Sequence, residues 1–164
     1  DFVRAQTPAG DALAIYSSAE ALSAHRPGDR PMALDFRTIG LTALIETGGR
    51  VVVNPGTDAV LLPRPAVAAL AQGDQWLPAW RDVALRELLL AEASAACSAI
   101  TDLSITYAGD GLTRVIVSVE RSCFTGAANA SAMKQSLTQA LSHVGANRRL
   151  IASADRVEIA PILA

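Results

Sequence analysis

Apolar and polar positions alternate with turn signals along the chain, and the clearest case lies near its middle. The three valines of Val51–Val53 end at Asn54-Pro55-Gly56, and a second apolar run begins at Val60. Pro55 presets the backbone for the second position of a type II turn, and Gly56 supplies the positive φ that the third position requires. The pattern therefore predicts two strands joined by this turn.

The rest of the first half predicts a hairpin and three helices. Two short apolar runs separated by Thr-Pro-Ala-Gly-Asp predict the hairpin, and serine, proline and glycine at helix ends predict the helix limits. The expected elements are strands over residues 2–6 and 12–16, a helix capped by Ser17 or Ser18 and ending near His25, a loop over 26–31, a helix over 36–46 closed by Gly48-Gly49, and a helix over 66–72 with Pro65 in its first position and Gly73 at its stop.

The second half predicts a long helix, a hairpin, another helix and a final strand. Asp110-Gly111 is a two-residue hairpin signal, and apolar residues alternate on both sides of it. The expected elements are a helix over 81–97, a strand carrying Leu103, Ile105 and Tyr107, a strand carrying Val115, Val117 and Val119, a helix over 129–143 with Met133, Leu137, Leu141 and Val144 on one stripe, and a strand carrying Val157 and Ile159.

Because helices and strands are intermixed and hairpins are present, the sequence predicts an α+β fold. We expect two small α/β subdomains, residues 1–80 and 81–164, each with a short mixed or antiparallel sheet flanked by helices. A chain of 164 residues is long enough for two such units. The two halves show no internal repeat beyond a hairpin and helices in each.

Composition excludes several classes of protein. Hydrophobic residues make up 51 % and aromatic residues 4 %, so the chain is not disordered and its core consists mainly of Ala, Val, Leu and Ile. A net charge of −2 gives no global field that would attract nucleic acid or an anionic membrane. No apolar run approaches the roughly 20 residues of a membrane span, and no signal peptide is visible. We therefore expect a cytoplasmic protein.

Cys123 is the one candidate nucleophile that the sequence singles out. It follows a strand, and Arg121 would favour its thiolate form. Its base would have to be His25 or His143, which lie in different halves of the chain. A structural cysteine at a strand end is the preferred interpretation, with a thiol-dependent enzyme as the alternative. Cys97 is expected to be a small buried hydrophobe, and a disulfide with Cys123 is the less favoured option.

No motif for a metal ion or a cofactor is visible. His25, Asp29 and Asp35 could converge across a loop, but nothing in their spacing requires it, and ordinary solvated side chains are the simpler interpretation. The glycine pairs precede strands, whereas a phosphate-binding turn leads into a helix. We expect no catalytic residues, no metal and no cofactor.

The best interaction signal is a cluster of bulky residues in the predicted connector, namely Trp76, Leu77, Pro78 and Trp80. Tryptophan is enriched at binding hot spots, so this cluster is a candidate interaction surface. The alternative, which we favour, is that the two rings pack internally between the halves of an aromatic-poor chain.

Two of these segments resemble motifs of SseB-type proteins, a family named for enhanced serine sensitivity. Residues 14–22, Ala-Ile-Tyr-Ser-Ser-Ala-Glu-Ala-Leu, resemble its stretch of an aromatic residue, Ser or Thr, Ser, any residue, Glu, any residue and Leu. Val51–Val53 with Asn54-Pro55-Gly56, followed by Leu61-Leu62 and the helix after Pro65, resembles its VVxNPG block. Tyr16-Ser17-Ser18 stands where the family usually has Phe-Thr-Ser. The second half is similar to the family's C-terminal domain in its order of elements.

The resemblance implies a bacterial protein without a defined biochemical activity and supplies no catalytic residues. We expect a non-enzymatic interaction or regulatory module that binds another protein or a second copy of itself, and neither nucleic acid nor a membrane. The alternative is a regulatory domain that binds an amino acid or a related metabolite between the halves.

Overall fold

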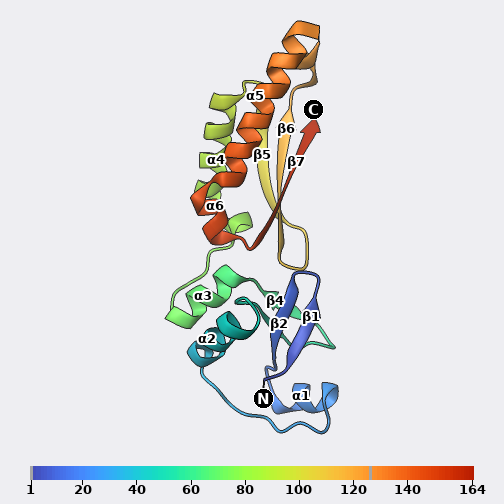
Figure 1. Cartoon of the computed structure of the whole chain (residues 1–164), viewed down its shortest axis with the longest axis vertical. Coiled ribbons are helices and arrows are strands. Elements are labelled where there is room, and N and C mark those ends of the chain that lie inside the picture. The colour runs from blue at the N-terminus through green and yellow to red at the C-terminus, as the bar shows by residue number, and fades with distance from the viewer. Residues whose placement is uncertain (1, 126) are drawn as a thin grey trace. The chain divides into compact units, whose positions relative to one another are not determined.

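Two separate β-sheets organise the chain, one in each half (Figure 1). The computed structural model describes residues 2–125 and 127–164, except for the side chains of residues 127–129. The chain divides into two compact units, Asp1–Trp76 and Leu77–Ala164. Both sheets are mixed and both are flanked by helices, which confirms the predicted α+β class.

The first sheet has four strands in sequence order, β1 (Arg4–Thr7), β2 (Gly10–Ile15), β3 (Val51–Val53) and β4 (Val60–Leu62). Strands β1 and β2 form the predicted hairpin, β2 and β3 are parallel, and β3 and β4 are antiparallel. The turn after β3 is the expected one, because Thr57 N–H donates to the carbonyl of Asn54 and Gly56 has a φ of 96°. After this turn the chain runs back along β3 as β4, the edge strand of the sheet.

Three helices accompany this sheet, α1 (Ala19–His25), α2 (Phe36–Glu46) and α3 (Arg64–Gln72). The Ser18 hydroxyl caps α1 by accepting from Ala21 N–H, as predicted, and Gly73 ends α3 with a φ of 80°. The predicted first position of α3 was wrong by one residue, because Arg64 begins the helix and Pro65 follows it. Side chains of α2 and α3 pack on one face of the sheet, in a core that contains Leu13, Ala43, Val51 and Val67.

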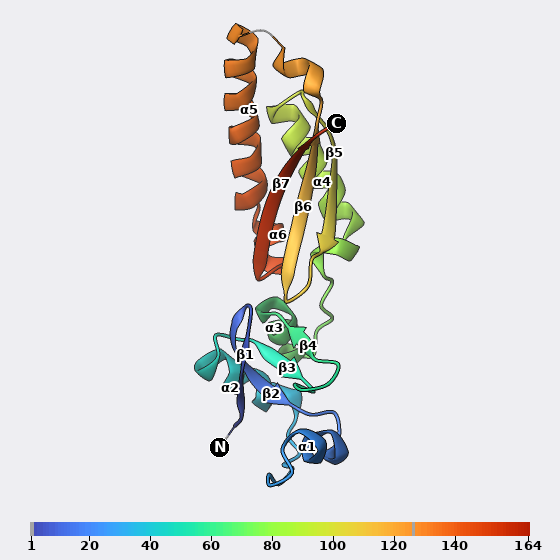
Figure 2. The same cartoon turned by 90° about the vertical axis from the view of Figure 1, so that its right-hand side faces the viewer.

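The second sheet has three strands, β5 (Ile100–Tyr107), β6 (Leu112–Val119) and β7 (Arg156–Leu163), and β6 lies between the other two (Figure 2). Strands β5 and β6 form the predicted hairpin, and β7 runs parallel to β6. Asp110 and Gly111 occupy the centre of the hairpin turn with φ values of 50° and 73°. Positive φ at both positions is what a two-residue hairpin turn demands.

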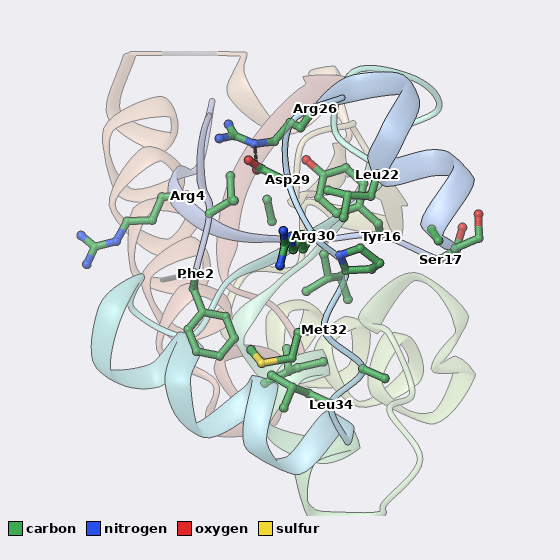
Figure 3. Close-up of a pocket in the computed structure, with 18 residues that line it drawn as sticks. Phe2, Arg4, Tyr16, Ser17, Leu22, Arg26, Asp29, Arg30, Met32 and Leu34 are labelled. Atoms are coloured by element: carbon green, nitrogen blue, oxygen red, sulfur yellow. Dashed lines mark hydrogen bonds and ion pairs between the residues drawn. The ribbon is translucent and has the colours of Figure 1, made fainter.

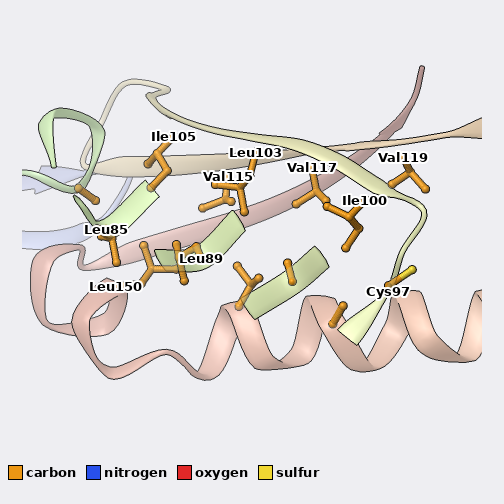
Figure 4. Close-up of a cluster of buried hydrophobic side chains, with 14 of the residues drawn as sticks. Leu85, Leu89, Cys97, Ile100, Leu103, Ile105, Val115, Val117, Val119 and Leu150 are labelled. Atoms are coloured by element: carbon orange, nitrogen blue, oxygen red, sulfur yellow. The ribbon is translucent and has the colours of Figure 1, made fainter. Parts of the chain in front are cut away.

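The helices of the second unit are α4 (Val83–Ala96), α5 (Ala127–Ala146) and α6 (Arg148–Ser153), with short 3₁₀ turns η1 (Ala79–Arg81) and η2 (Arg121–Phe124). They cover one face of the sheet, and their buried side chains meet those of the strands (Figures 1 and 4). The fully buried members include Leu85, Leu89, Leu103, Val115, Val117 and Leu150. Predicted stripe residues Met133, Leu137 and Leu141 pack against this core, and Val144 is buried in it. Helix α6 was not predicted from the sequence.

The two units share one segment, β1–β3 in the first and β5–β7 in the second, whose common topology was not predicted from the sequence. In each, an antiparallel hairpin is followed by two helices and by a third strand that runs parallel to the second strand. The order and direction of these strands and helices are therefore repeated, although their amino-acid sequences are not.

Candidate functional site

A hollow of about 970 Å³ lies in the first unit, between the start of β1, the end of β2, helix α1 and the loop that joins α1 to α2 (Figure 3). We call it the N-terminal groove. Its lining combines apolar side chains with a few polar and charged ones, as ligand sites generally do. The lining residues used below are Phe2, Arg4, Tyr16, Ser17, Arg26, Asp29, Arg30, Met32 and Ile39.

One wall of the groove is fixed by a link between the two stretches that carry the family resemblance. The Asn54 side-chain oxygen accepts from Ser17 N–H at 2.9 Å and from the Ser17 hydroxyl at 3.2 Å. The Asn54 amide group in turn donates to the Ser17 hydroxyl oxygen at 3.0 Å. Asn54 has a φ of 52°, a left-handed conformation that asparagine tolerates better than most residues. The turn after β3 therefore holds the chain at the start of α1.

At the other end of α1, the His25 ring lies over the same turn. The His25 ring lies so close to Gly56 that a Cβ there would be 2.5 Å from His25 Cδ2. The Tyr16 hydroxyl lies 2.9 Å from His25 Nδ1, which ties the end of β2 to the end of α1. A side chain at position 56 would therefore be strained by the φ of 96° and would also have to displace the His25 ring. The Asn-Pro-Gly turn is thus bonded to the chain at the start of α1 and lies against the side chain at its end.

Burial and neighbouring charges shift the pKa values of two polar groups in the groove, those of Tyr16 and Arg26. Burial raises the pKa of the Tyr16 phenol, with the Arg26 charge opposing and the Asp29 charge adding to the shift. Arg26 Nε donates to the Asp29 carboxylate, and this bond raises the pKa of the Arg26 guanidinium (Figure 3). Arg4 forms an ion pair with Glu46 at 3.1 Å. Arg30 makes no ion pair within the part of the chain that the structure describes.

The candidate metal ligands have other roles. His25 contacts Tyr16, Asp29 pairs with Arg26, and Asp35 caps α2 by accepting from Thr38 N–H at 2.9 Å. Over residues 2–125 and 127–164, no three His, Cys, Asp or Glu side chains are grouped so that they could hold a metal ion.

The candidate nucleophile lies in the second unit. Cys123 is half-buried in η2 and packs against the core, and Cys97 is buried beside Met133, with 3.7 Å between the two sulfur atoms. Both thiols are free, so the less favoured disulfide does not form in this structure. His143 is exposed in the last turn of α5, and His25 lies in the other unit.

The predicted connector cluster is split between the two units. Trp76 is the last residue of the first unit, whereas Leu77, Pro78 and Trp80 belong to the second. The centroids of the Trp80 and Tyr107 rings are 4.8 Å apart, and Trp80 packs against the core of its own unit. Leu77 is exposed. An interaction role for Trp76, Leu77, Pro78 and Trp80 stays a prediction.

The sequence did not predict the groove itself. Residues 26–31 are predicted only as a loop, although this loop carries Arg26, Asp29 and Arg30 and leads to the exposed Met32. A large apolar residue, Met32, that follows three charged residues in a predicted loop was the signal available in the sequence.

Comparison with known families bears directly on this unit. Residues 1–69 match the model of the SseB protein N-terminal domain. The first unit therefore carries an SseB N-terminal domain. The match contains every groove residue and both halves of the Ser17–Asn54 link. No curated protein and no solved structure matches the chain.

Among the described residues, no helix is both long and apolar enough to cross a membrane.

Proposed function

We propose that this SseB-family protein is a non-catalytic binding module that holds a segment of another protein in its N-terminal groove. The observation that carries the proposal is the link between Asn54 and Ser17. It joins the two family-like stretches and sets the wall of a hollow that is large enough for several side chains. A fold that fixes the wall of a groove in this way presents its lining in one preorganised shape, which lowers the cost of binding.

Photo-crosslinking from within the groove tests this proposal. A photoreactive phenylalanine analogue replaces Met32, which is 67 % exposed in the lining. The control places it at Ile151, which is 55 % exposed on α6 of the second unit. We expect a discrete adduct with a protein of the host from position 32 and none from position 151. Excess unlabelled protein should suppress the adduct, whereas excess Met32→Asp protein should not. Equal labelling from both positions would contradict the proposal.

A small-ligand regulatory role is the second candidate. The observation in its favour is that Tyr16, Arg26 and Asp29 place polar groups on one largely apolar hollow, the usual composition of a metabolite site. Thermal unfolding with each of the twenty amino acids in excess tests this role. A ligand present at a hundred times its Kd stabilises a protein by about 2.7 kcal/mol, which is readily measured. Unchanged midpoints with all twenty would exclude amino acids.

A further inference from the structure

The charge of the N-terminal groove differs from that of the whole chain. The lining contains three arginines and one aspartate, whereas the chain carries a net charge of −2. Arg26 is paired with Asp29, and Arg4 with Glu46. This leaves Arg30 as the guanidinium without an ion-pair partner among the described residues that line the groove. A fixed positive charge in a hollow attracts a ligand of opposite charge.

The apolar part of the groove is suited to side chains that vary in shape. Phe2 and Ile39 are half-buried there, and Met32 is exposed (Figure 3). Methionine is flexible and polarizable, and is common on surfaces that accept different peptides. An occupant that covered Met32 would remove an exposed apolar side chain from water, and this burial would favour binding.

The size of the hollow favours a chain segment over a single metabolite. Its volume of about 970 Å³ lies at the upper end of the range of about 300–1,000 Å³ for small-molecule sites. One amino acid would leave most of this space filled with water. A peptide segment of several residues could contact Arg30 and the apolar lining together.

We infer that the N-terminal groove selects a peptide segment of a partner protein that combines acidic with apolar side chains. The acidic side chain pairs with Arg30, and the apolar side chains cover Met32 and Phe2. The inference rests on the proposed function, because it names the chemistry of the occupant of the same groove.

Selection from a random peptide library displayed on phage tests this chemistry. The full-length protein is the bait, and the enriched peptides are synthesised with a fluorescent label and titrated by anisotropy. The variants are Arg30→Glu, Arg30→Lys, and Arg37→Glu as the matched control, because Arg37 is an exposed arginine of the same unit outside the groove. Met32→Asp reports whether a peptide binds in the groove at all.

We expect the enriched peptides to contain Asp or Glu beside Leu, Ile or Phe. Arg30→Glu should weaken their binding about tenfold, which corresponds to about 1.4 kcal/mol, and Arg30→Lys and Arg37→Glu should change it little. The wild-type affinity should also fall as the salt concentration rises, because the Arg30 contact is exposed to solvent.

Three other outcomes would overturn the inference. If Met32→Asp abolishes binding but the peptides are neutral or basic, or ignore Arg30→Glu, the groove proposal stands and the acidic chemistry is wrong. If no peptide is enriched, or binding survives Met32→Asp, both proposals fail. If free aspartate displaces the peptides, the occupant is a small carboxylate instead.

Discussion

Replacing Asp82 should destabilise the second unit by loosening the helix layer that covers its sheet. Asp82 is 8 % exposed and caps α4, with its Oδ1 accepting from Leu85 N–H at 3.0 Å. The same carboxylate receives Arg149 of α6, with nitrogen–oxygen distances of 2.7, 2.8 and 3.0 Å. One side chain therefore begins one helix and anchors another that lies 67 residues further along the chain.

The expected size of the effect follows from these two roles. Loss of an N-cap costs about 1 kcal/mol. Loss of the pair with Arg149 costs about 1–2 kcal/mol, at the low end for charged hydrogen bonds because the arginine side chain is 48 % exposed. We therefore expect Asp82→Ala to lower the free energy of unfolding of this unit by about 2–3 kcal/mol. Asp82→Asn keeps an acceptor for the cap and should lose only about 1–2 kcal/mol.

Urea unfolding followed by tryptophan fluorescence measures this loss. A Trp76→Phe background leaves Trp80, which packs in the core of the second unit beside Tyr107, as the reporter of that unit. Adding Arg149→Met completes a double-mutant cycle that isolates the pair. The reasoning is refuted if Asp82→Ala costs less than about 0.5 kcal/mol, the range of ordinary surface substitutions. It is also refuted if Asp82→Asn and Asp82→Ala cost the same.

Two further predictions concern the first unit. Gly56→Ala should cost more than about 2 kcal/mol, because alanine is strained at a φ of 96° and its Cβ would collide with His25. The control is Gly28→Ala, whose new atom has nothing within 4 Å and which should change the free energy of unfolding by less than about 0.5 kcal/mol. Thermal unfolding measures both variants, and equal losses of stability would contradict the reasoning. Hydrogen bonds from Thr38 lower the pKa of Asp35 below its ordinary 3.8. Since a lowered folded-state pKa stabilises above the unfolded value, this stabilisation is present above pH 3.8 and is lost as the pH falls through the folded-state pKa. The unfolding midpoint of the wild type should therefore fall more steeply below pH 3.8 than that of Asp35→Asn, and parallel profiles would refute it.

Much of the fold could be predicted because its limits are set locally. Ser18 caps α1, and Asp110-Gly111 turns the second hairpin. Each of these effects depends on a residue and its near neighbours in sequence, so a single chain displays them. Helix α6 was missed although Asn147 caps it in the same way, because six residues carry too little apolar periodicity to indicate a helix.

The groove could not be predicted for a different reason. Its wall depends on Asn54 meeting Ser17 across 37 residues of sequence and on His25 fitting over Gly56. Neither contact follows from the pattern around one position. The sequence did reveal the residues at both ends of these contacts, as a cap and as a turn, but gave no sign that they meet.

The contact between Asn54 and Ser17 also separates residues that build the groove from residues that could touch a ligand. Ser17, Asn54 and Gly56, which lie in the stretches that resemble SseB proteins, act on the backbone by forming a turn and joining it to the start of α1. Arg30 and Met32, which would touch a ligand, lie on the loop outside those stretches. The family-like stretches therefore build the wall of the groove, whereas the proposed occupant would contact loop residues outside those stretches. A search for the partner should accordingly begin from the charge and shape of this loop.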